Sequence, residues 1–187
     1  ANFTIVGIFN LSPDGRKIAF SASGQDGVPR IWVRSMDSLT AQPLPGSETG
    51  ASLAALFWSP DSRSIAYQGD GKLKKIDAAG GPAVVLCEAP EQIVGGAWNR
   101  DGVIVFRKGG ALVRVSAAGG IPTEVTAIDS KRGENYHLIP TFLPDGKHFV
   151  YTISGSQAVS GVYVGSLDVK PAEQSKERLL ITTLGAP

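Results

Sequence analysis

The chain has 187 residues, of which 42% are hydrophobic and 19% are charged, and its formal net charge at pH 7 is +1. This composition is typical of a folded globular domain or of part of a longer repeat array, and it excludes a disordered chain. A net charge so close to zero provides no general attraction to nucleic acid or to an anionic membrane surface, so we expect no nucleic-acid partner.

Residues that commonly carry chemistry are few. Cys87 is the only cysteine, and the only histidines are His137 and His148. No His-Glu-x-x-His or Cys-x-x-Cys pattern occurs, so we expect no metal site and no cofactor, and we expect Cys87 to be a small buried residue. No apolar run approaches the roughly 18 residues that cross a bilayer, so we expect no direct membrane insertion.

The first part of the chain reads as four short strands, near residues 3–11, 17–22, 30–36 and 41–44. The run Leu11–Gly15 has the sequence Leu-Ser-Pro-Asp-Gly and predicts a tight turn between the first two strands. Proline presets φ, aspartate accepts hydrogen bonds from nearby backbone N–H groups, and glycine accepts a positive φ. A single carboxylate in such a turn supplies too few oxygens for calcium, so turn capping is the favoured role.

The same pattern returns three more times along the chain. The four copies are Leu11–Gly15, Trp58–Ser62, Trp98–Gly102 and Phe142–Gly146. Their aspartates follow one another after 47, 40 and 44 residues, close to the roughly 40 to 45 residues of a propeller blade. An apolar strand follows each copy, and we expect the large apolar residue that opens each copy to be buried.

A second kind of turn recurs with the same spacing as the repeat. Ala78–Gly81 and Ala117–Gly120 both read Ala-Ala-Gly-Gly and predict hairpins between the third and fourth strands of their units. Helical periodicity is absent throughout. The sequence therefore predicts an all-β chain, a β-propeller built of four-stranded antiparallel blades, with four blades present. We expect a single, partial propeller domain over residues 1–187, with blades at about 1–46, 47–88, 89–127 and 128–187.

The runs Leu11–Phe20 and Trp58–Tyr67 closely resemble the TolB-like propeller repeat, which is related in shape to WD-type propellers. The sequences of the segments Ile31–Ser35, Lys72–Asp77 and Val162–Asp168 resemble the C-terminal region of bacterial serine/threonine protein kinases, notably acidobacterial ones. That resemblance implies a binding or sensor module of a receptor-like kinase that lies outside the cytoplasm. No kinase motif is present in this chain.

We expect this chain not to be an enzyme. It contains no Gly-x-Ser-x-Gly nucleophile elbow, and Gly46–Gly50 has glycines at that separation with serine in the wrong place. Two alternatives to the kinase module stay open. One is the propeller domain of a prolyl-oligopeptidase-like serine peptidase, and the other is an envelope scaffold of the TolB type.

The variable loops on one face of the propeller are the predicted binding surface for a protein, a peptide or a small molecule. The longest connection between blades, Ser130–His137, combines charged, aromatic and imidazole groups within eight residues. An ordinary solvated loop with an internal pair of Arg132 and Glu134 is the competing interpretation. The candidate ligand-binding residues on this face are Glu48, Glu91, Arg132, Glu134, Tyr136 and His137.

Four blades are the lower limit for a closed propeller, and TolB-like propellers generally have more. An open array would leave the apolar faces of its end blades bare. We therefore expect these faces to meet remaining blades or a second copy of the chain.

Overall fold

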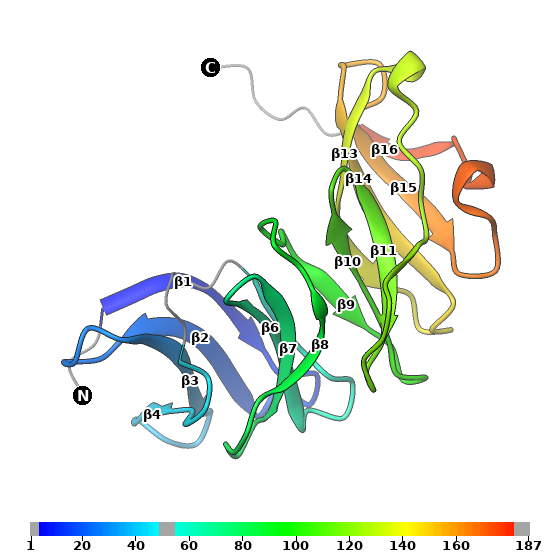
Figure 1. The fold of residues 1–187 in the computed structure, drawn as a ribbon. Coiled ribbons are helices and arrows are strands. Elements are labelled where there is room, and N and C mark those ends of the chain that lie inside the picture. Colours follow the sequence, from blue (N-terminus) through cyan, green and yellow to red (C-terminus); the bar gives the residue numbers. More distant parts are fainter. Residues whose placement is uncertain (1–3, 49–54, 182–187) are drawn as a thin grey trace. The chain divides into compact units, whose positions relative to one another are not determined.

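The computed structural model describes residues 4–48 and 55–181. Within these residues the secondary structure consists of β-strands and two short 3-10 turns, without an α-helix. The strands form four sheets, each of four antiparallel strands in sequential order (Figure 1). The all-β, four-bladed prediction is confirmed. None of the described segments is a helix with the length and hydropathy of a membrane span.

The first two blades follow one another along the chain. Blade 1 consists of β1 (Thr4–Leu11), β2 (Lys17–Ser23), β3 (Pro29–Ser35) and β4 (Gln42–Pro43). Blade 2 consists of β5 (Leu56–Trp58), β6 (Ser64–Gly69), β7 (Lys72–Asp77) and β8 (Val84–Glu88).

Blades 3 and 4 are built in the same way. Blade 3 consists of β9 (Gly96–Trp98), β10 (Val103–Lys108), β11 (Ala111–Ser116) and β12 (Thr123–Glu124). Blade 4 consists of β13 (Glu134–Phe142), β14 (His148–Gly155), β15 (Gly161–Ser166) and β16 (Arg178–Ile181). The 3-10 turns are η1 (Ser130–Arg132) and η2 (Pro171–Glu173).

The chain divides into two compact units. Unit 1 comprises residues 1–93 with 116–120, and unit 2 comprises residues 94–115 with 121–187. Each unit has its own core, and the two are described separately below. That the whole chain is one propeller domain stays a prediction.

The repeated turns are held by their own polar side chains. Ser12 Oγ donates to Asp14 Oδ1 at 2.6 Å, and the same oxygen accepts from the Arg16 backbone N–H at 3.0 Å. Ser59 Oγ donates to Asp61 Oδ1, also at 2.6 Å. The serine hydroxyl is the main cause of the lowered pKa of each aspartate. The predicted capping role of these two aspartates is confirmed.

In the third copy the capping group changes. Asn99 Oδ1, and not Asp101, accepts from the backbone N–H groups of Asp101 at 3.1 Å and Val103 at 2.8 Å. The third turn therefore closes with a neutral amide where the first two use a carboxylate. An asparagine side chain can bond its own backbone in this way and stabilise a turn.

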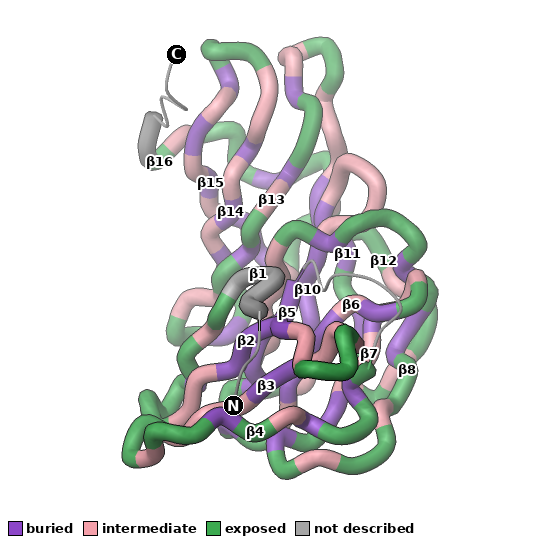
Figure 2. Tube along the Cα trace, turned by 90° about the vertical axis from the view of Figure 1, so that its left-hand side faces the viewer, coloured by how far each residue is buried: buried purple, intermediate pink, exposed green. Residues whose placement is uncertain are grey.

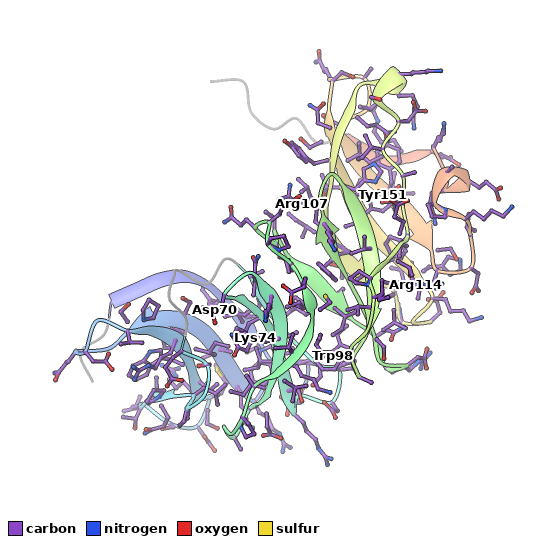
Figure 3. The ribbon with its side chains drawn as sticks, in the orientation of Figure 1. Asp70, Lys74, Trp98, Arg107, Arg114 and Tyr151 are labelled. Atoms are coloured by element: carbon purple, nitrogen blue, oxygen red, sulfur yellow. The ribbon has the colours of Figure 1, made fainter. Side chains whose placement is uncertain are left out.

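The β6–β7 hairpin turns on the pair Asp70-Gly71. Asp70 has φ 55° and Gly71 has φ 70°, so both central residues are left-handed as a type I′ turn requires. Asp70 Oδ2 also accepts from Lys74 Nζ at 2.5 Å, and Figure 3 shows the two side chains on this hairpin. The turn matches the right-handed twist of the strands that it joins.

Within unit 1, blades 1 and 2 share an apolar core. Two aliphatic residues of blade 1, Ala19 and Ile31, pack with the aromatic residues Trp58 and Tyr67 of blade 2. All four are buried, and Figure 2 shows buried residues along β2 and β3 of blade 1 and along β6 of blade 2. Blade 1 therefore presents aliphatic side chains to the blade that follows it.

Unit 2 is packed by the same rule. Val105 and Leu112 of blade 3 meet the aromatic residues Phe149, Tyr151 and Tyr163 of blade 4. Gly165 makes room for this cluster, because a Cβ at that position would lie 2.4 Å from Phe149 Cζ. In both units the aromatic rings of the shared core come from the later blade.

The burial expected for the four turn-opening residues holds only in part. Trp58 is buried, but Trp98 and Phe142 are only partly buried and Leu11 is 55% exposed. The prediction was wrong for Leu11 because, among the described residues, no neighbouring blade covers the face of β1 on which it lies, whereas blade 1 covers the equivalent face of blade 2 and buries Trp58. Asn10 faces blade 2, where its Nδ2 donates to the Leu56 carbonyl, so Leu11 points to the opposite face.

Candidate functional site

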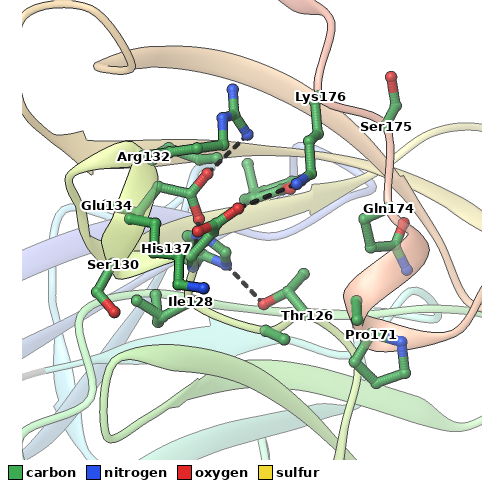
Figure 4. Close-up of a pocket in the computed structure, with 16 residues that line it drawn as sticks. Thr126, Ile128, Ser130, Arg132, Glu134, His137, Pro171, Gln174, Ser175 and Lys176 are labelled. Atoms are coloured by element: carbon green, nitrogen blue, oxygen red, sulfur yellow. Dashed lines mark hydrogen bonds and ion pairs between the residues drawn. The ribbon is translucent and has the colours of Figure 1, made fainter.

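A pocket of about 470 Å³ opens in unit 2, within the range of roughly 300 to 1,000 Å³ that is usual for small-ligand sites. The connection from β12 to β13, the strand β14 and the turn η2 supply its walls (Figure 4). It is lined by Thr126, Ala127, Ile128, Asp129, Ser130, Lys131, Arg132, Glu134, His137, Tyr151, Ile153, Pro171, Ala172, Gln174, Ser175 and Lys176.

A chain of hydrogen bonds runs through the pocket floor. Thr126 Oγ1 accepts from the Leu112 backbone N–H at 2.9 Å and lies 2.8 Å from His137 Nδ1. His137 Nε2 lies 3.2 Å from Glu134 Oε2. Arg132 Nη1 donates to Glu134 Oε1 at 2.8 Å, and the Asp129 backbone N–H donates to Oε2 at 2.9 Å.

The direction of these bonds follows from the charge of His137. Burial lowers the pKa of His137, against the opposing effect of the Glu134 carboxylate, so the imidazole is neutral near pH 7. A neutral ring has one donor and one acceptor. Nε2–H therefore donates to Glu134, and Nδ1 accepts from the Thr126 hydroxyl.

Thr126, His137 and Glu134 have the connectivity of a nucleophile, a base and an orienting carboxylate. The Thr126 side chain, however, is fully buried, and its oxygen already accepts the Leu112 N–H bond. A substrate carbonyl could not approach such an oxygen without displacing the backbone of β11. The arrangement therefore fits a structural network that fixes η1 against β13, and it does not fit an acyl-transfer site.

Tyr151 adds a polar group to this floor. Its side chain is 3% exposed and lines the pocket, and its ring centroid lies 5.2 Å from that of His137. Among the described residues no hydrogen bond is seen for its hydroxyl. Tyr67, at the equivalent position of blade 2, donates to the Gly46 carbonyl at 3.4 Å. Burial and the nearby Glu134 carboxylate raise the pKa of Tyr151, so its hydroxyl remains a donor at neutral pH.

Three cations and two carboxylates line the pocket. Lys176 Nζ lies 3.0 Å from Asp129 Oδ2, and this bond is the main cause of the lowered pKa of Asp129. Glu134 is paired with Arg132. Lys131 is exposed at the rim, and no ion pair of its ammonium is seen in the described part of the chain.

The pocket gathers half of the residues predicted from the sequence. Arg132, Glu134 and His137 line it. Tyr136 does not, because it is 47% exposed and its ring lies under the Arg107 guanidinium, 5.3 Å from the ring centroid. The neighbouring strand positions of Tyr136 and His137 explain the split, since successive side chains point to opposite faces.

Glu48 and Glu91 belong to unit 1 and do not line this pocket. Glu48 Oε2 accepts from the Gly46 backbone N–H at 2.9 Å, so it caps its own turn. Glu91 is exposed, and its backbone carbonyl accepts from Gln68 Nε2 at 2.6 Å. For neither carboxylate does a described contact indicate a ligand site.

The prediction that residues 130–137 form a loop was wrong from Glu134 onward. Glu134, Tyr136 and His137 belong to β13 and pair with Gly155, Ser154 and Ile153 of β14. Although this run is rich in charged residues, its second part is a strand. Two of the buried side chains of that strand are the paired carboxylate of Glu134 and the neutral imidazole of His137. The predicted pair of Arg132 and Glu134 is present.

Sequence reasoning missed Thr126, Tyr151 and Lys176. Tyr151 carried one signal, since it occupies the aromatic position of the repeated strand and only Tyr67 shares its hydroxyl there. Thr126 and Lys176 carried none, because they are 50 residues apart and meet only through folding. Among the described residues, no group of three or more His, Cys, Asp or Glu side chains could hold a metal ion.

No protein-family model matches the chain. Among curated proteins, it is 30% identical over 149 residues to a protein of Bacillus subtilis (strain 168) named uncharacterized peptidase YuxL. The match covers 75% of this chain and 20% of that protein. The chain thus spans about a fifth of the length of this relative.

Solved structures show the same fold. A protein described as TolB from Agrobacterium tumefaciens has a TM-score of 0.68 and 20% identity, with 86% of this chain and 61% of that chain covered. TolB from Acinetobacter baumannii has a TM-score of 0.62 and 17% identity, with 89% and 41% covered. The β-propeller domain of the Trilobed protease from Pyrococcus furiosus has a TM-score of 0.63 and 20% identity, with 88% and 55% covered.

These likenesses and the four blades define the class: the chain has the β-propeller fold. Its neighbours within that class include TolB proteins and the propeller of a protease.

Proposed function

We propose that this chain is a non-catalytic binding module of a larger protein and that its ligand enters the unit 2 pocket. The observation that carries the proposal is the Tyr151 hydroxyl, which belongs to a residue only 3% exposed, lines the pocket and has no hydrogen-bond partner among the described residues. Buried polar groups are normally hydrogen-bonded. The rigid network of Thr126, His137 and Glu134 would hold the floor in place while a ligand binds.

A matched pair of substitutions tests this proposal. Ala172 lines the pocket from η2 and is exposed, whereas Ala158 is also exposed but lies on the β14–β15 turn and does not line the pocket. Ala172→Trp should abolish binding of small peptides and peptide analogues, measured by calorimetry or by NMR shifts of Ile153. Ala158→Trp should leave binding unchanged. Equal binding by both variants would contradict a ligand site in this pocket.

The similarity to a peptidase supports one candidate for the larger protein. In this proposal the module is the propeller of a serine peptidase and admits or orients peptides for a separate hydrolase domain. It is supported by the 30% identity to a peptidase of which four fifths lies outside the match, and by the likeness to a protease propeller. A downstream Gly-x-Ser-x-Gly in the complete gene would agree with it.

The second candidate is the sensor module of a receptor-like serine/threonine kinase. Its support is the sequence resemblance of the repeats alone. Kinase motifs upstream of the chain, including His-Arg-Asp and Asp-Phe-Gly, would support it. Sequencing the complete gene therefore distinguishes the two hosts. In both, the purified chain should show no turnover of its own, and activity that is lost in a His137 variant would contradict the proposal.

We also propose that the face of blade 1 that carries Phe9 and Leu11 packs against a further blade that presents aliphatic residues. On this face Phe9 is 68% exposed, and Phe9 and Leu11 pair across the strands with Phe20 and Ile18. Aromatic residues also lie on the face of blade 2 that meets blade 1, and blade 1 contributes aliphatic residues there. The covering blade would belong to the same protein or to a second copy.

Sedimentation distinguishes these two sources. If a second copy covers the face, the protein should dimerise and Phe9→Asp should dissociate the dimer. If a blade of the same protein covers it, the protein should be monomeric and Phe9→Asp should lower its melting temperature. A monomer whose melting temperature is unchanged by Phe9→Asp would contradict both.

A further inference from the structure

Most charged and amide side chains of the unit 2 pocket are already paired. Both carboxylates of the floor and rim are occupied, Glu134 by Arg132, His137 and the Asp129 N–H, and Asp129 by Lys176. Gln174 is also fully engaged, because its Oε1 accepts from the Ser166 N–H and its Nε2 donates to backbone carbonyls.

The groups open to a ligand include the Tyr151 hydroxyl, the serine hydroxyls of Ser130 and Ser175, and positive charge at the rim. Glu134 takes one N–H of the Arg132 guanidinium, at Nη1, and a guanidinium has five such donors in all. The exposed Lys131 ammonium adds a charge that neither Glu134 nor Asp129 compensates. A ligand that satisfies these groups must present acceptors, and an anionic acceptor fits them best.

The remaining wall is apolar. Ala127, Ile128, Ile153, Pro171 and Ala172 line the same pocket. A ligand that is charged along its whole length would place charged groups against these apolar side chains, where the charges would lose water without gaining hydrogen bonds. A short aliphatic body would instead cover the apolar side chains and remove them from water. The volume of about 470 Å³ accommodates such a body together with a small anionic group.

We infer that this pocket binds a carboxylate that carries a short aliphatic body, with the Tyr151 hydroxyl and the rim cations on the carboxylate and the aliphatic part against Ile128 and Ile153. The inference rests on the proposed binding function and names its ligand class. A peptide C-terminus and a free small carboxylic acid share this chemistry.

Two tyrosines of the same core provide a matched pair for the test. The Tyr151 and Tyr163 ring centroids lie 6.1 Å apart, and both side chains are buried. Tyr163 does not line the pocket, and its hydroxyl donates to the Val159 carbonyl at 2.8 Å. Tyr151→Phe removes only the donor that faces the ligand, and Tyr163→Phe removes one that serves the fold.

The probes are N-acetyl-alanyl-leucine as the free acid, the same dipeptide as its C-terminal amide, and 4-methylpentanoate, each titrated calorimetrically into the purified protein. We expect the acid to bind at least about tenfold more tightly than the amide, as a hydrogen bond to a charged group implies. Tyr151→Phe should weaken binding of the acid by about tenfold, and Tyr163→Phe should leave it unchanged. Higher salt should weaken binding of the acid and leave binding of the amide unchanged.

The affinity for 4-methylpentanoate shows whether the carboxylate comes from a peptide C-terminus or from a small carboxylic acid. Binding of 4-methylpentanoate as tight as that of the dipeptide acid would identify a small carboxylate, and tighter binding of the dipeptide would identify a peptide terminus. Equal affinity for acid and amide, or an unchanged affinity in Tyr151→Phe, would overturn the inference. If neutral ligands then still distinguish Ala172→Trp from Ala158→Trp, the binding function stands without the carboxylate. If no ligand distinguishes the two variants, both the proposed binding function and the inferred ligand class are wrong.

Discussion

The indole N–H of Trp58 donates to the backbone carbonyl of Asn10 at 3.0 Å and so joins the second blade to the first. Trp58 is also buried in their shared core. Trp58→Ala should therefore lower the free energy of unfolding by about 3 to 5 kcal/mol. Trp98→Ala should cost clearly less, because Trp98 is only partly buried. Urea unfolding of both variants measures the difference, and equal costs would contradict the packing described for unit 1.

Stability should depend on the protonation of His137. Its pKa is lowered in the folded protein, mainly by burial, so below the unfolded value of about 6.5 the unfolded chain binds more protons and stability falls as the pH decreases. The free energy of unfolding should decrease from pH 7.5 to 5.5, by at most about 1.4 kcal/mol per pH unit. His137→Gln should remove this slope.

The second histidine provides the control for that experiment. His148 is exposed on β14 and contacts Asp145, and it takes no part in the Thr126–His137–Glu134 network. His148→Gln should therefore keep the slope between pH 7.5 and 5.5. A slope that follows His148 and not His137 would show that the buried imidazole does not titrate as described.

Asp145 should titrate with a pKa of about 2, mainly because His148 Nδ1 bonds its carboxylate, with further bonds from the backbone N–H groups of His148 and Lys147. NMR titration of the side-chain carboxyl measures this value. His148→Ala should move the pKa of Asp145 toward its ordinary value of about 3.9. A pKa that does not change in the variant would mean that the backbone donors alone account for the shift.

Gly165→Ala should destabilise unit 2. The added Cβ would lie 2.4 Å from Phe149 Cζ, and Phe149 is fully buried. Overpacking of this kind costs about 1 to 3 kcal/mol. Phe149→Leu, combined with Gly165→Ala, should recover part of the loss relative to the sum of the two single variants. Additive losses in thermal unfolding would show that the clash is relieved elsewhere.

The sequence by itself determined the repeat and therefore the strands. The turns at Ser12–Asp14 and Ser59–Asp61 form through bonds between residues two apart, so local sequence specifies them. The sequence also predicted that Cys87 would be buried, and it is. Within the candidate site, Arg132 and Glu134 could be paired in advance because they too are two residues apart.

Tertiary structure decided which of those groups act together. Tyr136 and His137 are neighbours in sequence, yet the alternation of β13 sends one to Arg107 and the other to Thr126. Lys176 reaches Asp129 across 47 residues, and Tyr151 enters the pocket floor because the aromatic face of blade 4 packs against the aliphatic residues of blade 3. A repeat specifies each blade through short-range bonds, but a pocket depends on side chains that meet only when separate strands and turns pack together.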